Sequence, residues 1–352
     1  MSAVHVAVPA RGRADGPVRV LVAGDANLDL VLTGDVVPRF GQEEQLLESS
    51  RLVLGSSAGI VAHGLARLGV ETTLVACVGD DDFGRVTLDR LRDGGVDTSG
   101  VRVVAGAATG LSVVLSAPHD RSILTDTGAM TSVGVADVRR ALDAARDAGR
   151  PFGHLHVASW FLLPGLAAGL PALFAELRAV GTTISLDTNW DPAGAWAGVG
   201  DALPHVDLFL PNGEELRAVG AVLGEQPASD GPGDGATAHG QDADHDHDPD
   251  LAAARSIAAR GPAVVVKAGR EGGWSLRAGG QPVRHPGLVL DVVDTTGAGD
   301  SFDAGYLAAF TTGVDDERER LRWATTAGSL STRAAGGTGA QATPADLERV
   351  PA

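Results

Sequence analysis

Short apolar runs, each followed by a cluster of polar residues, alternate with helix-like segments along much of the chain. The runs at residues 18–23 and 263–267 are rich in Val, and the runs at 154–158 and 183–186 contain Leu with Val or Ile, which is typical of buried strands. Several of the segments between them carry small and apolar residues at helical spacing. This alternation predicts a mostly parallel sheet with helices on both faces, and the polar clusters should gather along the edge where the strands end.

Two stretches depart from this alternation and are predicted to form a small separate sheet. Residues 31–54 and 106–126 contain short segments in which apolar and polar residues alternate, and the segments are separated by Pro, Gly or charged residues. This is the pattern of β-hairpins. The α/β domain would then comprise residues 18–30, 55–105 and 127–352.

Two further segments are predicted to be disordered. Residues 1–17 have scattered arginines and lack the apolar stretch of a signal peptide, so they indicate an unstructured tail. Residues 225–250 are rich in Gly, Ala, Asp and His and contain no basic residue. Such a composition cannot bury enough apolar surface to fold, so it predicts an acidic disordered insertion within the α/β domain.

The overall charge narrows the range of partners. The 352 residues include 45 Asp and Glu against 28 Lys and Arg, and the formal net charge is −17. This balance argues against a nucleic-acid or anionic-membrane partner. The one cysteine, Cys77, lies in an apolar run and is expected to be buried. No apolar run approaches the roughly 20 residues of a membrane-spanning helix, so we expect a cytoplasmic protein.

The most informative stretch is DTTGAGDSF at residues 294–302. The apolar run at 287–293 before it is predicted to be a buried strand, and residues 301–310 after it are predicted to be helical. A strand, a glycine-rich turn and a helix N-terminus together form a site for an anion. Asp300 would lie in the first helical turn, where it could accept a proton from a hydroxyl that attacks a phosphate. The alternative is an ordinary acidic helix start.

This stretch resembles the C-terminal signature of the ribokinase-like, PfkB-type carbohydrate kinases. The resemblance implies a three-layer α/β/α sandwich with a mostly parallel central sheet and a small β-sheet lid. It also implies ATP-dependent transfer of the γ-phosphoryl group to a hydroxyl of a sugar or sugar-like substrate. Asp300 would be the general base, and the amides of Gly297, Ala298 and Gly299 would form the anion hole.

The same resemblance assigns a substrate site near the first strand. Asn27 and Asp29 would bind the sugar hydroxyls, together with Gly55 and Ser56 at the start of the next helix. Asp29 could instead belong to an ordinary Asp- and Asn-rich turn. The family usually has an Asn where this chain has Ile60, and an apolar side chain cannot make the hydrogen bonds of that Asn. Two alternatives therefore stay open: a nucleoside kinase of the same superfamily, and a non-catalytic sugar or nucleotide sensor.

Two groups of residues would serve the nucleotide. Asn212 and Glu215 match an N-x-x-E motif that is tied to Mg²⁺ and phosphate in the family, with Glu215 acting through water. Without the resemblance, they would be an Asn turn and an acidic helix start. Lys267, Gly269 and Gly272 would form the nucleotide edge of the site, and Lys267 could face either the ATP phosphates or the solvent.

The resemblance also suggests a monovalent cation, such as K⁺, at Asp294 and Thr296, and Thr296 would lie near the nucleotide as well. The expected partner is a small-molecule sugar or nucleoside. A homodimer formed through the lid is possible by analogy with the family. The sequence leaves open which sugar or nucleoside is used and which hydroxyl is phosphorylated.

Overall fold

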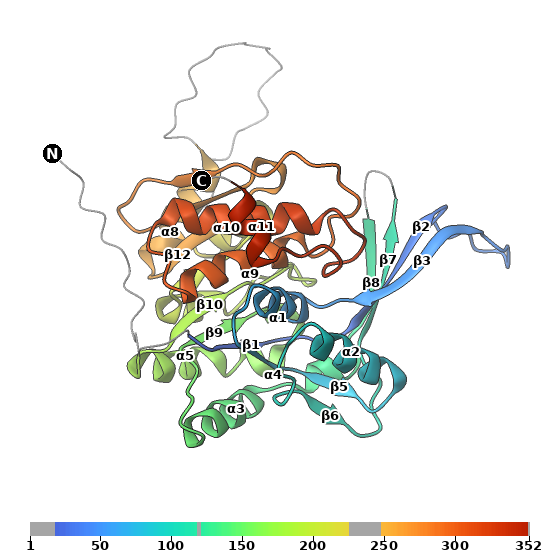
Figure 1. Ribbon diagram of the computed structural model, residues 1–352, viewed down its shortest axis with the longest axis horizontal. Helices are drawn as coiled ribbons and strands as arrows, with labels where there is room; N and C mark the ends of the chain where they lie inside the picture. The colour runs from blue at the N-terminus through green and yellow to red at the C-terminus, as the bar shows by residue number, and fades with distance from the viewer. Residues whose placement is uncertain (1–17, 118–120, 225–247, 351–352) are drawn as a thin grey trace, which may run out of the picture.

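The computed structural model describes residues 18–117, 121–224 and 248–350, and its centre is an eight-stranded sheet (Figure 1). The six strands from β4 to β12 are parallel, and β13 and β14 complete the edge as an antiparallel pair. In spatial order the strands are β14 (Val283–His285), β13 (Gly273–Leu276), β12 (Ala263–Lys267), β11 (Leu208–Phe209), β10 (Thr183–Leu186), β9 (His154–Val157), β1 (Val20–Ala23) and β4 (Thr72–Val75).

Helices cover both faces of this sheet, which gives the predicted three layers (Figure 1). One face is covered by α3 (Val135–Asp147), α4 (Pro164–Ala167), α5 (Leu170–Ala179), α6 (Val199–Ala202), α7 (Gly213–Val222) and α8 (Pro249–Ala259). The other is covered by α1 (Ser57–Arg67), α2 (Asp82–Asp93), α9 (Ala298–Thr311), α10 (Glu317–Ser331) and α11 (Pro344–Arg349). Short 3₁₀ turns lie at Gly128–Ser132, Trp160–Leu162, Leu203–His205 and Gly269–Glu271.

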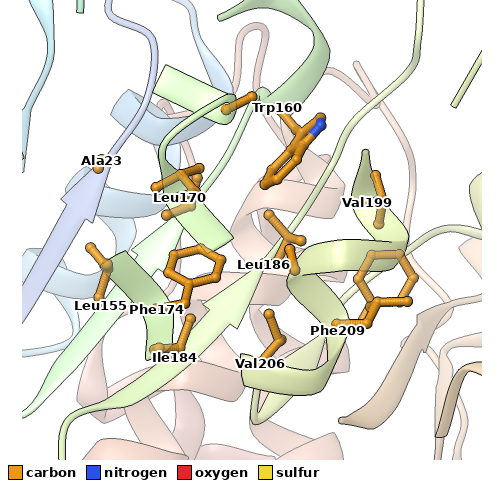
Figure 2. Packing of buried hydrophobic residues seen from close by; sticks show 14 of the residues in the cluster. Ala23, Leu155, Trp160, Leu170, Phe174, Ile184, Leu186, Val199, Val206 and Phe209 are labelled. Carbon is orange, nitrogen blue, oxygen red and sulfur yellow. The ribbon is translucent and has the colours of Figure 1, made fainter. Parts of the chain in front are cut away.

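Strand β1 shows how a central strand packs into both cores of the domain. Leu21 and Ala23 pack into the core beneath α3 to α8, whereas Val20 and Val22 pack into the core beneath α1 and α9. Successive side chains of a strand point to opposite faces, so a strand covered on both faces favours apolar residues at every position. The buried polar residues of β9 and β10 are instead hydrogen-bonded to one another: His154 contacts Thr183 and Ser185, and His156 contacts Ser185. Figure 2 shows part of the first core, where Phe174 lies among side chains contributed by several of these strands and helices.

A second, four-stranded sheet extends away from this domain (Figure 1). Its order is β3 (Leu47–Leu54), β2 (Leu28–Gly34), β7 (Leu111–Ser116) and β8 (Arg121–Asp126), with two antiparallel pairs joined by a parallel one. Strand β2 begins at Leu28 rather than at residue 31, so Asp29 belongs to this sheet. A two-stranded sheet of β5 (Cys77–Gly79) and β6 (Arg102–Val104) completes the strands.

The structure corrects two sequence-based predictions. Residues 287–293 form no strand, because β14 ends at His285 and Pro286 and Gly287 follow. Val289, Val292 and Val293 in this segment are exposed. The predicted insertion ends before residue 250, because Asp248 caps α8 with hydrogen bonds to the amides of Asp250 and Leu251. The predicted tail, residues 1–17, and the rest of the insertion, residues 225–247, lie outside the described residues.

Cys77 is buried, as predicted. Among the described residues, no helix combines the length and apolar character needed to cross a membrane.

Candidate active site

The polar clusters that end the parallel strands lie close together, and helices α1 and α9 begin beside them. The chain leaves β1 for β4 on one side of the sheet and returns to β9 on the other side. Open α/β sheets place ligands at the carboxyl ends of strands where the order reverses in this way. Asp25 follows β1, and its carboxylate accepts hydrogen bonds from the amides of Ser57 at 3.2 Å and Ala58 at 2.9 Å. These bonds fix the start of α1 beside the end of β1.

The Gly-Ala-Gly turn opens helix α9. Gly297 is the N-cap residue with φ of 70°, a left-handed conformation that favours glycine. A Cβ at this position would lie 2.5 Å from Cα of Gly337. The amide of Ala298 donates to the carbonyl of Thr295 at 3.2 Å, so it is engaged within the turn. The hydrogen bonds among the described residues include none from the amides of Gly297 or Gly299, and first-turn amides of this kind are available to an anion.

The side chain of Ile60 packs against this turn. A Cβ on Gly297 would lie 3.0 Å from Cδ1 of Ile60, and one on Gly337 would lie 2.4 Å from the same atom. The Ile60 side chain is buried. The residue that departs from the family pattern therefore packs against the backbone of the signature turn.

Asp300 lies in the first turn of α9, as predicted from its spacing to the glycines. One carboxylate oxygen, Oδ1, accepts a short hydrogen bond from the hydroxyl of Ser57. The Ser57 Oγ in turn accepts from Nδ2 of Asn189 at 3.1 Å, and Asn189 Oδ1 accepts from the amide of Ser159 at 2.8 Å. Burial, with a further contribution from Asp187, raises the pKa of Asp300 to about 7.

The predicted substrate residues form a second cluster at the base of the four-stranded sheet. Asp29 is buried, and its Oδ1 accepts from Nδ2 of Asn27 at 3.1 Å. Burial raises the pKa of Asp29 to about 7, with a contribution from Asp25. Ser56 has φ of 67°, and its hydroxyl donates to the carbonyl of Gly55. A positive φ in a non-glycine residue costs free energy, and such strained residues cluster at functional sites.

Gly55 is required by the position of Asp29. A Cβ on Gly55 would lie 2.1 Å from Oδ1 of Asp29. We expect Gly55→Ala to displace the Asp29 carboxylate and to raise KM for the acceptor at least tenfold, with the affinity for nucleotide unchanged. Gly134→Ala is a matched control, because Gly134 has φ of −146° and a Cβ there meets only an atom 3.9 Å away. Equal KM values for the two variants would contradict this role of Gly55.

Asn212 and Glu215 form a capping box at the start of α7. Asn212 Oδ1 accepts from the amides of Glu214 and Glu215, both at 2.9 Å, and Glu215 Oε2 accepts from the amide of Asn212 at 2.8 Å. The helix-start alternative is therefore present in the structure. The capping box uses neither the Asn212 Nδ2 nor the Glu215 Oε1. Burial and the nearby Asp187 raise the pKa of Glu215 to about 7.

Lys267 ends β12, and its ammonium lies between two buried carboxylates. Its Nζ lies 2.7 Å from Oδ2 of Asp187 and 3.1 Å from Oδ2 of Asp303. Of the two environments that the sequence left open for Lys267, the solvent does not apply, because the side chain is largely buried, and a contact with the ATP phosphates stays a prediction. A cavity of about 520 Å³ adjoins this strand end, and Asn212, Lys267 and Ala268 are among the residues that line it.

The remaining nucleotide residues lie in turns. Gly269 and Gly272 have φ of 57° and 94°, and a Cβ on Gly272 would lie 2.2 Å from the carbonyl oxygen of His285. They bound the turn between β12 and β13. This geometry gives both glycines a structural role, and their place at the nucleotide edge of the site stays a prediction.

Asp294 braces the start of the signature turn. Its Oδ1 accepts from the amide of Thr296 at 2.9 Å, and its Oδ2 accepts from the amide of Gly336 at 2.8 Å. Arg121 of β8 donates to the hydroxyls of Thr295 at 3.2 Å and Thr296 at 3.5 Å. The second sheet thus contacts the signature turn through Arg121.

The sequence analysis did not identify several residues of the site as functional: Asp25, Ser57, Ser159, Asp187, Asn189 and Asp303. Asp187 and Asn189 belong to a polar cluster, DTNWD, that visibly follows a predicted strand. Their position in a polar cluster at the end of a strand could have identified them as candidate site residues. Ser57 gave no such signal, because its partner Asp300 lies 243 residues away in the chain.

Comparisons with known proteins identify the family of this chain. The family model described as pfkB family carbohydrate kinase matches residues 19–344. An ATP-dependent ribose-1-phosphate kinase of Halopiger xanaduensis is 32% identical over 333 residues, which cover 93% of this chain and 95% of that protein.

Solved structures share the fold. The Arabidopsis thaliana ribokinase in complex with ribose and ATP matches with a TM-score of 0.74 at 22% identity, over 95% of this chain and 98% of that one. A Burkholderia thailandensis nucleoside kinase in complex with inosine matches with a TM-score of 0.71 at 20% identity, over 93% and 96%. The chain therefore belongs to the PfkB family of carbohydrate kinases, phosphotransferases whose acceptor is an alcohol group.

Proposed function

We propose that this protein transfers the γ-phosphoryl group of ATP to a hydroxyl of a ribose-type sugar, with Asp300 as the general base. The observation that carries the proposal is the hydrogen bond from the Ser57 hydroxyl to the Asp300 carboxylate at the start of α9. A base that activates an alcohol must accept this kind of hydrogen bond from it. The amides of Gly297 and Gly299 lie in the same helical turn.

The arrangement separates the two charges that the reaction must manage. Asp300 would take the proton of the acceptor hydroxyl, while the amides at the N-terminus of α9 would stabilise negative charge on the transferred phosphoryl group. The positive end of the helix dipole favours this anion at the same place. The Asp300 pKa of about 7 leaves a substantial fraction of the carboxylate ionised at neutral pH. Such a value lies near the optimum for a general base.

The residues around Glu215 fit a magnesium ion that accompanies ATP. The buried Glu215 carboxylate has one oxygen outside the capping box, and oxygen ligands, often reached through water, suit Mg²⁺. Glu215 would hold the ion, which would supply charge neutralisation of the phosphates. The two oxygens of Asp294 already accept backbone amides. A K⁺ ion near Asp294 and Thr296 would have to bind without breaking these two hydrogen bonds.

The acceptor is proposed to be a sugar because several buried or half-buried polar side chains near the strand ends could bind hydroxyl groups. Asn27 donates to Asp29, and Asn189 donates to Ser57, the partner of Asp300, so these residues offer both donors and acceptors. The relative from Halopiger xanaduensis is named for ribose-1-phosphate. A nucleoside, which shares the ribose ring, is the second candidate, and the packing of Ile60 against the signature turn does not discriminate between the two.

A panel of acceptors tests this proposal. ADP release would be measured with Mg-ATP and ribose, ribose-1-phosphate, hexoses, keto-deoxy acids or nucleosides. We expect turnover with ribose or its 1-phosphate and at least tenfold lower kcat/KM with hexoses. Preference for a nucleoside would replace the sugar assignment. A rise in melting temperature with one of these compounds, but no ADP release with any, would indicate a sensor and would overturn the proposal.

A further inference from the structure

Lys267 is the only lysine in the sequence; all the other members of the 28 Lys and Arg residues are arginines. The arginine ion pairs of the described residues lie mostly at the surface, but the Lys267 side chain is only 11% exposed. Its two partners are covered even more completely: the side chains of Asp187 and Asp303 are 1% and 0% exposed.

These three residues join three elements of the site. Asp187 directly follows β10, Lys267 ends β12, and Asp303 lies one helical turn after Asp300 in α9. A Cβ on Gly299 would lie 3.3 Å from Cδ of Lys267, so the lysine stem passes directly beneath the glycine turn. The same Asp187 Oδ2 accepts from Nδ2 of Asn189 at 3.3 Å, and Asn189 donates to Ser57, the partner of Asp300.

We infer that Lys267 is a positioning residue of the phosphoryl transfer: its ammonium, held between Asp187 and Asp303, fixes the start of α9 to the sheet and thereby sets the place of Asp300 and of the glycine amides. The inference rests on the proposed role of Asp300. Positioning of this kind is energetically important, because a displacement of about 1 Å at a reacting group can lower the rate about 10²-fold.

The electrostatics follow from the same contacts. The charged groups that bear on Asp300 are Asp25 after β1, Asp187 after β10, Lys267 on β12 and Asp303 on α9. Of these, only Lys267 is a cation, so it favours the ionised form of Asp300, whereas Asp187 disfavours it. The Oδ1 of Asp303 is buried without a hydrogen-bond partner. Burial raises the pKa of Asp303, and the neighbouring ammonium of Lys267 opposes this shift.

The geometry also explains why residue 267 is a lysine, although every other residue of the Lys and Arg group in this chain is an arginine. An ammonium is compact and can donate to two carboxylates in different directions, whereas a guanidinium is a broad planar fork. With Cδ of the stem already beneath Gly299, the larger group would press on the turn. Lys267→Arg keeps the charge and changes the shape, so it separates the two contributions.

The test compares Lys267→Met, Lys267→Arg and Asp187→Asn with the wild type in kcat, in the pH dependence of kcat/KM and in nucleotide affinity. We expect kcat to fall about 10²-fold in Lys267→Met. The acidic limb of kcat/KM should move to higher pH in Lys267→Met and to lower pH in Asp187→Asn, because a cation and an anion are removed. A limb that stays in place in both variants would reduce the cluster to a structural role and overturn the inference.

A second readout covers the case in which Lys267→Met folds poorly. In wild-type protein labelled with ¹³C-lysine, the side chain should give one Cε resonance, and Lys267→Arg should abolish it. The inference requires this lysine to remain charged to high pH and its resonance to shift on binding a non-hydrolysable ATP analogue. A solvent-like resonance that is insensitive to the analogue would contradict it. Wild-type turnover that survives in Asp300→Ala would instead defeat the proposed function, whatever the lysine variants show.

Discussion

The variant Asp300→Ala is expected to lose kcat by about 10²–10⁴-fold while its affinity for ATP stays within about threefold of the wild type. The carboxylate is needed only when the acceptor hydroxyl loses its proton, so its removal should spare ground-state binding of the nucleotide. The measurements are steady-state ADP release and a binding titration with a non-hydrolysable ATP analogue. Equal losses of binding and rate would point to a structural role.

Asp316→Ala provides a matched control. Asp316 also stands at a helix N-terminus, where it caps α10 by accepting from the amide of Glu319 at 2.8 Å. Loss of an N-cap costs about 1 kcal/mol of folding free energy. The control should therefore lower the melting temperature and leave kcat unchanged, which is the opposite of the result expected for Asp300→Ala.

The assignment of Asp300 as the general base also determines the direction in which kcat/KM changes with pH. Burial raises the pKa of Asp300 to about 7, and a general base acts in its ionised form. The wild-type kcat/KM should therefore fall as the pH decreases through about 7. The raised pKa of Asp29, also about 7, would make this decline steeper if its ionised form binds the sugar.

The second large effect is expected for Gly297→Ala, with kcat lowered by about 10²–10³-fold, the range seen when one oxyanion-hole donor is lost. Gly297 has φ of 70°, and a Cβ there would lie 2.5 Å from the Gly337 backbone and 3.0 Å from Ile60 Cδ1. The turn must shift to relieve this overlap, and the amides proposed to face the phosphoryl group would shift with it. Steady-state kinetics on protein of confirmed folding would measure the loss.

Gly299→Ala is the comparison for this prediction. A Cβ on Gly299 meets the lysine stem at 3.3 Å, where a flexible side chain can yield by a few tenths of an ångström, and Gly299 has no positive φ. Its kcat should fall clearly less than that of Gly297→Ala. Similar losses in both variants would show that the backbone conformation at Gly297 is not the important feature.

The fold was predictable because its strongest signals are local. Apolar runs such as residues 18–23 appear as β1, and the family signature placed Gly297 and Asp300 at a helix start. Residues 287–293 were wrongly predicted to form a strand, for a physical reason. They have the composition of a strand, but β14 already forms the edge of the sheet, and the segment crosses to α10, where Val293 donates to the carbonyl of Thr332 at 2.8 Å.

The site was only partly predictable because its contacts are long-range. Lys267 had two plausible environments in the sequence, and neither was the pair of buried carboxylates that it contacts. Asn189 and Ser57 are 132 residues apart, and their hydrogen bond depends on the packing of α1 against the strand ends. Asn212 and Glu215 show a different limit, since the same two residues satisfy a capping box and the motif of a nucleotide site.

The central claim is that Asp300 activates an alcohol for attack on ATP. Its most direct test is ³¹P NMR of the protein with Mg-ATP and the preferred acceptor of the panel, run in parallel with Asp300→Ala. The account predicts that a phosphate monoester of the acceptor and ADP form in equal amounts with the wild type, and that the variant forms neither at a comparable rate. Formation of the ester by Asp300→Ala at the wild-type rate, or release of inorganic phosphate in place of the ester, would contradict it.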